Sequence, residues 1–306
     1  MSWPEPGRLA RLARPSGAFG MVALDQRESL RTILVEGAAV ERSAIADATL
    51  RAFKVAAARA LSPLASALLV DRDYGLAPIL EAGALDPRCA LLVAADRLTQ
   101  LPGGPVEETS IDEGAVGPAL AAGAIGLKLL VIWRDDGGRR RAAMVERFVR
   151  LCGDAGLISL VEGVVSRPPA DRADGWDGQA AIVEAARELG ATGCDLYKAE
   201  VPFHGQAEPD DIRQVAARIT EAVGCPWVVL SQGVSPERFP AALEAACRGG
   251  ASGFLAGRAI WSRAIGPRLD DGAFAAELGR VSVPALARLT EIMDAVARRL
   301  PASGRT

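Results

Sequence analysis

Short apolar runs separated by helix-like segments constrain the fold of this chain more than any other feature. Most of these runs are apolar at every position instead of alternating with polar residues, which is typical of parallel strands buried on both faces. They are Phe19–Leu24, Ala67–Val70, Cys89–Ala94, Gly126–Trp133, Leu157–Val161, Asp195–Val201, Trp227–Ser231 and Gly253–Ala256. Eight strands that alternate with helices predict an α/β fold of the (β/α)8 type, the TIM barrel.

Helices are predicted between the strands, where Ala-rich periodic segments lie between capping signals. The clearest are Glu41–Ala60, Arg139–Asp154, Gly178–Gly190, Pro209–Val223 and Pro236–Arg248. For the last of these we expect Ser235 to cap the helix and Pro236 to occupy its first position. The segment Leu98–Val116 contains the sequence PGGP and is predicted as a loop, either a lid or an irregular connection. The stretch from Asp270 to Arg299 is predicted as a closing helix pair.

Length and composition favour one domain and exclude several functional classes. Half of the 306 residues are hydrophobic, and no repeat or compositional break marks a second domain. We therefore expect a single domain over residues 1–306, with residues 1–16 as a flexible or helical extension. The net charge of −3 argues against a nucleic-acid partner. No run of 18 apolar residues predicts a membrane span, and the N-terminus lacks the apolar stretch of a secretory signal.

The cysteines favour a cytoplasmic location. Five of them are scattered along the chain without a CxxC pair, namely Cys89, Cys152, Cys194, Cys225 and Cys247. An odd, unpaired set predicts free thiols in a reducing cytosol. The sequence leaves open whether the protein forms a homo-oligomer.

Lysine is rare in this chain, which has 32 arginines but only Lys54, Lys128 and Lys198. Arginine is effectively always protonated, whereas a buried lysine can lose its proton and attack a carbonyl carbon. Lys128 and Lys198 lie within apolar strand-like runs, where an ammonium group is costly unless it is paired or neutralised. The alternative is that the three lysines are remnants of a composition bias without a selected role.

The strand ends supply a set of groups that fits Schiff-base chemistry. In such barrels the active site lies at the C-terminal ends of the strands. Asp25 follows the first strand, Lys128 lies in the fourth, Glu162 ends the fifth and Lys198 lies in the sixth. The two lysines come from alternate strands and should share an interior layer, where repulsion and burial would favour loss of a proton from each. An amine nucleophile with carboxylates beside it can form an imine with a ketone and cleave a carbon–carbon bond.

Two further strand-end acids have a simpler explanation. Asp71 follows the second strand and Asp96 the third, at positions where an aspartate often caps the next helix. We expect both to act as caps. Asp25 and Glu162 have comparable structural alternatives, as a cap and a solvated acid respectively.

The last two strands end in short glycine motifs that favour a phosphate site. The residues are Ser231, Gln232, Gly233, Gly257 and Arg258. Loops after strands seven and eight of TIM barrels often bind phosphate through backbone N–H groups, and an arginine adds a charge-assisted contact. The alternative is a pair of tight turns beside a surface arginine.

The single histidine argues against two other kinds of site. A zinc site built from histidines needs two or three of them, and His204 is the only one in the chain. A Ser-His-Asp triad would depend on the same residue. We therefore expect His204 to be a surface loop residue, and we expect no metal and no organic cofactor.

Several motifs resemble a known family, the class I aldolases that cleave tagatose 1,6-bisphosphate and sulfofructose 1-phosphate. The similarity covers residues 17–266 and is carried by ALDQRESLR (23–31), FKVAAARALSPLASALLVD (53–71), LKLLVIWRDD (127–136), DLYKAEVP (195–202), LSQGVSPERFP (230–240) and GASGFLAGRAIW (250–261). The combination looks closest to the sulfofructosephosphate branch. The resemblance implies a metal-independent aldehyde-lyase that holds its substrate as a covalent lysine imine.

The resemblance also implies individual roles. Lys198 would form the Schiff base, with Glu162 and Lys128 as its acid/base and electrostatic partners and Asp25 orienting the intermediate. Gln26 and Arg27 would meet the distal anion of the substrate. The phosphate of the dihydroxyacetone phosphate half would bind at Ser231, Gln232, Gly233, Gly257 and Arg258. Lys54 matches a family position but receives no role, and either reaches the anion or lies on a helix face.

Two departures from the sulfosugar pattern leave the substrate open. Gly163 stands where a proline is expected in those relatives, and Gln232 stands where a second serine is common. We predict cleavage of 6-deoxy-6-sulfofructose 1-phosphate to dihydroxyacetone phosphate and sulfolactaldehyde. The alternatives are tagatose or fructose 1,6-bisphosphate as the substrate, or a non-catalytic sugar-phosphate sensor on the same scaffold.

Overall fold

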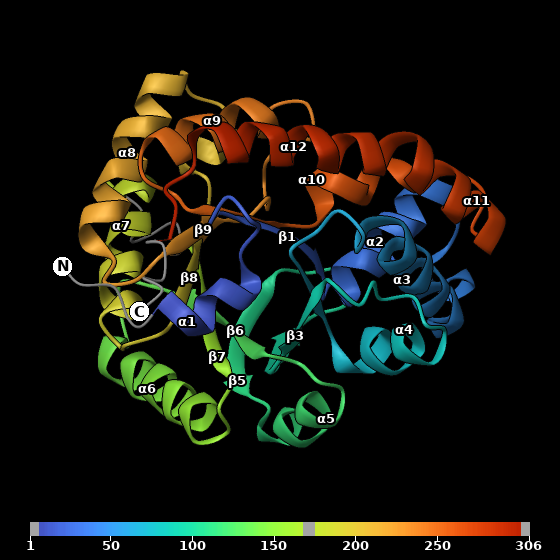
Figure 1. The fold of residues 1–306 in the computed structure, drawn as a ribbon, viewed down its shortest axis with the longest axis horizontal. Helices are drawn as coiled ribbons and strands as arrows, with labels where there is room; N and C mark the ends of the chain where they lie inside the picture. The colour runs from blue at the N-terminus through green and yellow to red at the C-terminus, as the bar shows by residue number, and fades with distance from the viewer. Residues whose placement is uncertain (1–5, 168–174, 301–306) are drawn as a thin grey trace.

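A closed barrel of eight parallel strands forms the centre of the molecule, which confirms the predicted TIM barrel (Figure 1). The computed structural model describes residues 6–167 and 175–300. The strands follow the circular order β1-β10-β9-β8-β7-β6-β3-β2. They are β1 (Phe19–Leu24), β2 (Ala67–Val70), β3 (Ala90–Ala94), β6 (Gly126–Trp133), β7 (Ile158–Val165), β8 (Leu196–Ala199), β9 (Trp227–Val229) and β10 (Gly253–Ala256).

Helices surround the barrel, and they return the chain from the end of one strand to the start of the next. They are α1 (Pro6–Leu9), α2 (Glu28–Ala38), α3 (Asp47–Leu61), α4 (Ala77–Glu81), α5 (Val116–Ala121), α6 (Gly138–Asp154), α7 (Gly178–Gly190), α8 (Pro209–Ala222), α9 (Phe239–Arg248), α10 (Arg258–Trp261), α11 (Asp271–Glu277) and α12 (Val283–Val296). The predicted closing helix pair is present as α11 and α12, and α12 packs along α9. No helix within residues 6–167 and 175–300 is long and apolar enough to cross a membrane.

The barrel strands are apolar throughout because their two faces enter two different cores. Residues such as Leu160 and Leu196 point inward and form an interior cluster, which Leu9 and Leu12 join from the N-terminal segment. The intervening residues, such as Val161, pack outward against the helices. Since successive side chains of a strand point to opposite faces, every second side chain points into the barrel interior.

The prediction of a loop over Leu98–Val116 is wrong. Strands β4 (Asp96–Gln100) and β5 (Val106–Ile111) form an antiparallel hairpin that pairs only with itself, and the PGGP sequence lies in its turn. The predicted helix start at Pro236 is wrong, because α9 begins at Phe239, although Ser235 Oγ accepts from the amide of Arg238 at 3.4 Å, as a capping side chain does. The amide of Phe239 donates to the carbonyl oxygen of Ser235 at 3.0 Å, so the residues between them form a turn that leads into the helix.

Candidate active site

Charged side chains replace the apolar interior residues at the C-terminal end of the barrel. Leu160 and Leu196 point inward, and the next inward positions on the same strands are Glu162 and Lys198, which are register partners across β7 and β8. Lys128 on β6 pairs in register with Leu160. The strand period of two thus brings all three charges into the barrel mouth, as the sequence predicted.

Lys128 lies at the centre of the mouth, surrounded by three carboxylates. Its Nζ is 2.6 Å from Asp25 Oδ2, 2.9 Å from Asp96 Oδ2 and 3.1 Å from Glu162 Oε2. All four side chains are less than a tenth exposed. A buried ammonium group surrounded in this way keeps its proton because the attraction of three carboxylates outweighs the loss of hydration.

The expected loss of a proton from Lys128 is therefore wrong. Burial alone would lower the pKa of Lys128, but Asp25, Asp96 and Glu162 together hold that pKa well above its ordinary value. Burial likewise opposes the charge on Asp25, yet Lys128 and Lys198 hold the pKa of its carboxyl far below the usual range. Asp25 and Lys128 thus stabilise each other's charged form.

Glu162 joins the two lysines through its two oxygens. Oε1 lies 3.0 Å from Lys198 Nζ, while Oε2 faces Lys128 and lacks a hydrogen bond with suitable geometry among the described residues. The side chain of Lys198 is only 4% exposed. A carboxylate beside an amine, with an oxygen still able to accept, is placed to exchange protons with that amine.

A cavity of about 800 Å3 opens above this cluster. Asp25, Lys128 and Glu162 line it, whereas Lys198 does not line it and contacts Glu162, which does. The β4–β5 hairpin borders the cavity through Leu98, and its far wall includes the start of α2. The volume is that of an ordinary small-molecule site.

Arg27 and Gln26 line the cavity beside Asp25, Lys128 and Glu162. The resemblance implied this location for both residues. Arg27 donates to Asp96 twice, from NH2 to Oδ1 at 2.7 Å and from NH1 to the carbonyl oxygen at 3.1 Å. Its Nε and the amide oxygen of Gln26 are buried without a hydrogen-bond partner among the described residues. Buried donors and acceptors in native proteins are normally paired, so these atoms are suited to a ligand.

The loops after β9 and β10 meet at a second polar corner. Ser231 Oγ accepts hydrogen bonds from the amides of Gly257 and Ala259, at 3.2 and 3.4 Å. Arg258 donates to the side-chain oxygen of Gln232 at 3.0 Å, and both residues line the cavity. Burial lowers the pKa of Arg258, although Glu162 and Asp25 oppose that effect. Ser231 thus meets Gly257, and Gln232 meets Arg258, but of the five predicted phosphate residues only Gln232 and Arg258 line the cavity.

Gly257 and Gly233 are glycines for different reasons. A Cβ at position 257 would lie 2.5 Å from the carbonyl oxygen of Ala23, so the loop can approach β1 only without a side chain. Gly233 has a φ of 76°, and a Cβ there would lie 2.7 Å from Nδ1 of His204. His204 itself is exposed in the loop after β8, as expected from the sequence.

Lys54 lies on helix α3, the second of its expected positions, on a buried face and apart from the cavity. It is fully buried on α3, where its Nζ pairs with Asp71 and donates to the carbonyl oxygen of Leu24 at 2.8 Å. Burial lowers the pKa of Lys54, although Asp71 opposes the shift. Asp71 also accepts from the amide of Tyr74 at 2.7 Å, which confirms its predicted capping role.

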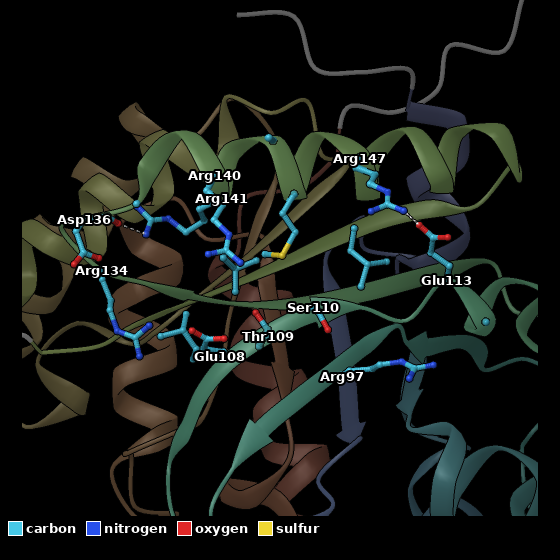
Figure 2. A pocket seen from close by; sticks show the side chains of 17 residues that line it. Arg97, Glu108, Thr109, Ser110, Glu113, Arg134, Asp136, Arg140, Arg141 and Arg147 are labelled. Carbon is cyan, nitrogen blue, oxygen red and sulfur yellow. Dashed lines mark hydrogen bonds and ion pairs between the residues drawn. The ribbon is translucent and has the colours of Figure 1, made fainter.

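A second cavity lies outside the barrel, between the β4–β5 hairpin and α6, and we call it the arginine groove (Figure 2). Its volume is about 770 Å3, and its arginines are Arg97, Arg134, Arg140, Arg141 and Arg147. Three of them form ion pairs, Arg97 with Asp112, Arg141 with Glu188 and Arg147 with Glu113. Arg140 forms neither an ion pair nor a hydrogen bond with any described residue. The groove and the mouth share the hairpin as a wall, with Ile132 lining both.

Asp96 is the site residue that sequence reasoning missed. It was expected to cap a helix, but its carboxylate is 1% exposed and contacts both Lys128 and Arg27. A signal was present, since Asp96 follows the inward-facing Ala94 by two residues and so continues the interior face of the third strand. An aspartate at a strand end fits both roles, and only the position of its partners decides between them.

Comparison with known proteins gives an independent view of the chain. A family model described as DeoC/LacD family aldolase matches residues 19–263. Tagatose 1,6-diphosphate aldolase 1 of Enterococcus faecalis is 28% identical over 295 residues, covering 88% of this chain and 87% of that protein. Tagatose 1,6-diphosphate aldolase of Streptococcus pneumoniae is 28% identical over 299 residues, with 88% of each covered.

Solved structures agree on the fold. A fructose-bisphosphate aldolase from Plasmodium falciparum aligns with a TM-score of 0.69 at 13% identity, covering 97% of this chain and 98% of that one. A Schiff-base-forming fructose-1,6-bisphosphate aldolase aligns with a TM-score of 0.57 at 14% identity, covering 94% and 99%. At these identities the likeness establishes the barrel and no more.

Proposed function

The chain belongs to the DeoC/LacD family of aldolases, and we propose that it is a class I enzyme that cleaves a ketose 1,6-bisphosphate through an imine on Lys198. Membership of this family makes it an aldehyde-lyase and speaks against the non-catalytic sensor. One observation carries the proposed mechanism: the carboxylate of Glu162 lies between Lys198 and a permanently charged Lys128. The chemistry needs no metal or organic cofactor, because the iminium itself accepts the electrons of the broken bond.

The reaction begins when the unprotonated Nζ of Lys198 attacks C2 of the ketose. Glu162, which has taken the proton released by Lys198, donates it to the departing hydroxyl, and loss of water leaves an iminium. A base, either Glu162 or a phosphate oxygen of the substrate, then removes the proton from the C4 hydroxyl. The C3–C4 bond breaks, its electron pair moves into the iminium to give an enamine, and the aldehyde departs. Protonation at C3 and hydrolysis release dihydroxyacetone phosphate and return the amine.

The contacts of the two lysines support Lys198 as the nucleophile. Asp25, Asp96 and Glu162 surround Lys128 and raise its pKa, so its amine stays protonated. Lys198 contacts one of these carboxylates, that of Glu162, at 3.0 Å. In this proposal Lys128 is therefore the electrostatic partner, and Lys198 is the amine that attacks.

The two ends of the substrate have distinct partners in this proposal. The 1-phosphate would bind Arg258, Gln232 and the backbone amides near Ser231, at the corner made by the last two strands. The 6-phosphate would accept a hydrogen bond from Arg27 Nε, which has no hydrogen-bond partner among the described residues, while the unpaired amide oxygen of Gln26 would accept one from a substrate hydroxyl. Both groups line the same cavity.

The substrate proposal favours a bisphosphate over a sulfosugar. The relatives named above are tagatose-bisphosphate aldolases, so they support the alternative substrate and give no support to sulfofructose 1-phosphate. The structure also gives Gly163 a reason of its own, because a Cβ there would lie 2.1 Å from the hydroxyl oxygen of Tyr197. The proline expected of sulfosugar relatives does not fit beside that tyrosine.

Borohydride trapping tests the mechanism directly. Reduction in the presence of dihydroxyacetone phosphate should attach one adduct to the Lys198 peptide, as read by peptide mass spectrometry. A Lys198→Arg variant is the matched control and should take up none, because its charge is retained while its nucleophile is lost. An adduct that persists in this variant, or none in the native protein, would rule out Lys198 as the Schiff-base residue.

Substrate preference is tested by comparing kcat/KM for tagatose 1,6-bisphosphate, fructose 1,6-bisphosphate and 6-deoxy-6-sulfofructose 1-phosphate. We expect the bisphosphates to be preferred, since a phosphate offers more negative charge to Arg27 than a sulfonate does. A higher value for the sulfosugar would reverse the substrate assignment and leave the mechanism intact.

A further inference from the structure

The carboxylate of Asp96 connects two cations that serve opposite parts of the site. Oδ1 accepts from Arg27 NH2 at 2.7 Å, at the place proposed for the distal phosphate. Oδ2 accepts from Lys128 Nζ at 2.9 Å and from the backbone amide of Leu130 at 3.1 Å. The carboxylate is 1% exposed, so water does not screen these contacts.

We propose that Asp96 is a positioning residue that couples occupation of the Arg27 anion site to the charge network around Lys128. Through it, the distal anion of the substrate raises the rate of carbon–carbon cleavage in addition to tightening binding. This inference rests on the proposed function, because it assumes that the substrate carries an anion at its far end.

The coupling follows from the sharing of one charge. In the structure Arg27 and Lys128 compete for the same buried carboxylate. An anion that binds Arg27 neutralises part of its positive charge. Asp96 is then attracted less to Arg27, and its attraction to Lys128 becomes stronger. Buried charges interact more strongly than exposed ones because the surrounding dielectric is low.

A stronger attraction between Asp96 and Lys128 affects Glu162, which is the acid of the proposed reaction. Lys128 divides its attraction among Asp25, Asp96 and Glu162. When Asp96 binds it more strongly, Glu162 is held less by Lys128 and is freer to exchange protons with Lys198 and the substrate. When the substrate lacks the distal anion, Arg27 stays paired with Asp96, and Glu162 stays paired with Lys128.

Asp73 provides a matched control for this inference. Its carboxylate lies 3.8 Å from Arg27 Nε and is 58% exposed, and no contact joins it to Lys128. Asp73→Asn therefore changes the charge around Arg27 without changing a side chain that contacts Lys128. Asp96→Asn changes both ends while keeping the shape of the side chain.

The test measures kcat and KM separately for a ketose 1,6-bisphosphate and the corresponding ketose 1-phosphate. In the native enzyme, loss of the distal phosphate should lower kcat as well as raise KM. In Asp96→Asn the ratio of the two kcat values should fall by about 10- to 100-fold, the value of a hydrogen bond to a charged group. In Asp73→Asn the kcat ratio should stay as in the native enzyme while KM changes.

Two results would overturn the inference: a native kcat that does not depend on the distal phosphate, or an Asp96→Asn enzyme that keeps the native kcat ratio. Should that variant fail to fold by circular dichroism, a second measurement uses the native enzyme alone. Added inorganic phosphite should raise kcat for the ketose 1-phosphate, and no increase would also overturn the proposal. Trapping with dihydroxyacetone phosphate, which lacks the distal half, reports on Lys198 separately.

Discussion

Lys54 and Lys128 are both buried, yet their environments move their pKa values in opposite directions. Burial lowers the pKa of Lys54, which faces the single carboxylate of Asp71 on the helix side of the barrel. Burial also acts against charge on Lys128, but three carboxylates in the barrel mouth raise its pKa well above the ordinary value. The comparison teaches that the number of acids around a buried lysine decides the direction in which its pKa moves.

The two lysines also differ in what they hold together. Lys54 joins α3 to the ends of β1 and β2 through Leu24 and Asp71. Lys128 joins the ends of β1, β3 and β7 at the place where a substrate would enter. We therefore expect changes at Lys54 to appear in stability and changes in the mouth to appear in the reaction rate.

The largest effect should come from removing the nucleophile. Lys198→Arg should lower kcat by about 10⁴-fold or more, since no other group can form the imine. The free energy of unfolding should change little, because arginine keeps the positive charge beside Glu162. Steady-state kinetics and urea unfolding measure the two quantities. Retention of more than a hundredth of native activity would move the nucleophile to another residue.

Lys128→Met should follow with a loss of about 10³-fold in kcat, in the range of a missing acid/base or electrostatic partner. It leaves Asp25, Asp96 and Glu162 without their shared cation, so the melting temperature should fall as well. Activity is compared per folded molecule, with folding followed by circular dichroism. An unchanged kcat would show that the charge on Lys128 is structural, like that on Lys54.

Lys54→Met should lower the free energy of unfolding by about 3 to 5 kcal/mol, because it leaves the carboxylate of Asp71 buried without a cation. The kcat of the folded fraction should stay within about threefold of native. The double variant Lys54→Met with Asp71→Asn should recover part of the stability, since no unpaired charge remains. A large loss of kcat would contradict the separation of the two regions.

Glu200 extends the comparison to a buried acid without a cation. It accepts a hydrogen bond from the Val165 amide at 2.7 Å, and burial raises its pKa from 4.5 to about 7. A raised folded pKa means that this group favours folding most at low pH, and that stability falls as the pH rises through 7. The shift corresponds to about 3 kcal/mol. Glu200→Gln should therefore gain up to that amount at pH 8 and nothing at pH 4.

Chemical denaturation across this pH range measures the effect of Glu200→Gln. The variant should show a flatter dependence of unfolding free energy on pH between about 4.5 and 7 than the native protein. A parallel pair of curves would show that Glu200 contributes nothing to the pH dependence.

The smallest effect is expected at Arg140 in the arginine groove, because this side chain is exposed and forms no ion pair with a described residue. Arg140→Ala should change the free energy of unfolding by no more than about 0.5 kcal/mol and leave kcat unchanged. Thermal melts and steady-state kinetics provide the measurements. A clear change in the free energy of unfolding or in kcat would show that Arg140 contributes to stability or to the reaction, as the residues of the mouth do.

The barrel and the positions of the mouth residues could be predicted from the sequence because both depend on local periodicity. Apolar runs fixed the strands to within a few residues, and the period of two placed Glu162 and Lys198 on the interior face. The hairpin could not be recognised in the same way, because its strands are largely polar. Only its two sides together bury an apolar face, at Leu98 and Val106, against Leu130, Val164 and Leu230 of the barrel.

The charge states in the mouth depend on distances that no sequence pattern contains. The raised pKa of Lys128 requires three carboxylates from separate strand ends to lie within 3.1 Å of one amine. The part played by Asp96 likewise requires Arg27, which belongs to a distant segment, to reach its other oxygen. The role of Lys54 was missed because its partner Asp71 was explained fully by capping.

The β4–β5 hairpin is hydrogen-bonded as a sheet of its own and stands outside the circle of eight strands. Residues such as Leu98 and Gln100 border the mouth, whereas Ser110 and Ile111 border the arginine groove. A segment of this kind is an exchangeable module: hairpins of other lengths between Arg97 and Ser110 would leave every barrel register in place while reshaping the entrance. Grafting such segments therefore offers a way to change which aldehydes the enzyme accepts without redesigning its reactive lysine.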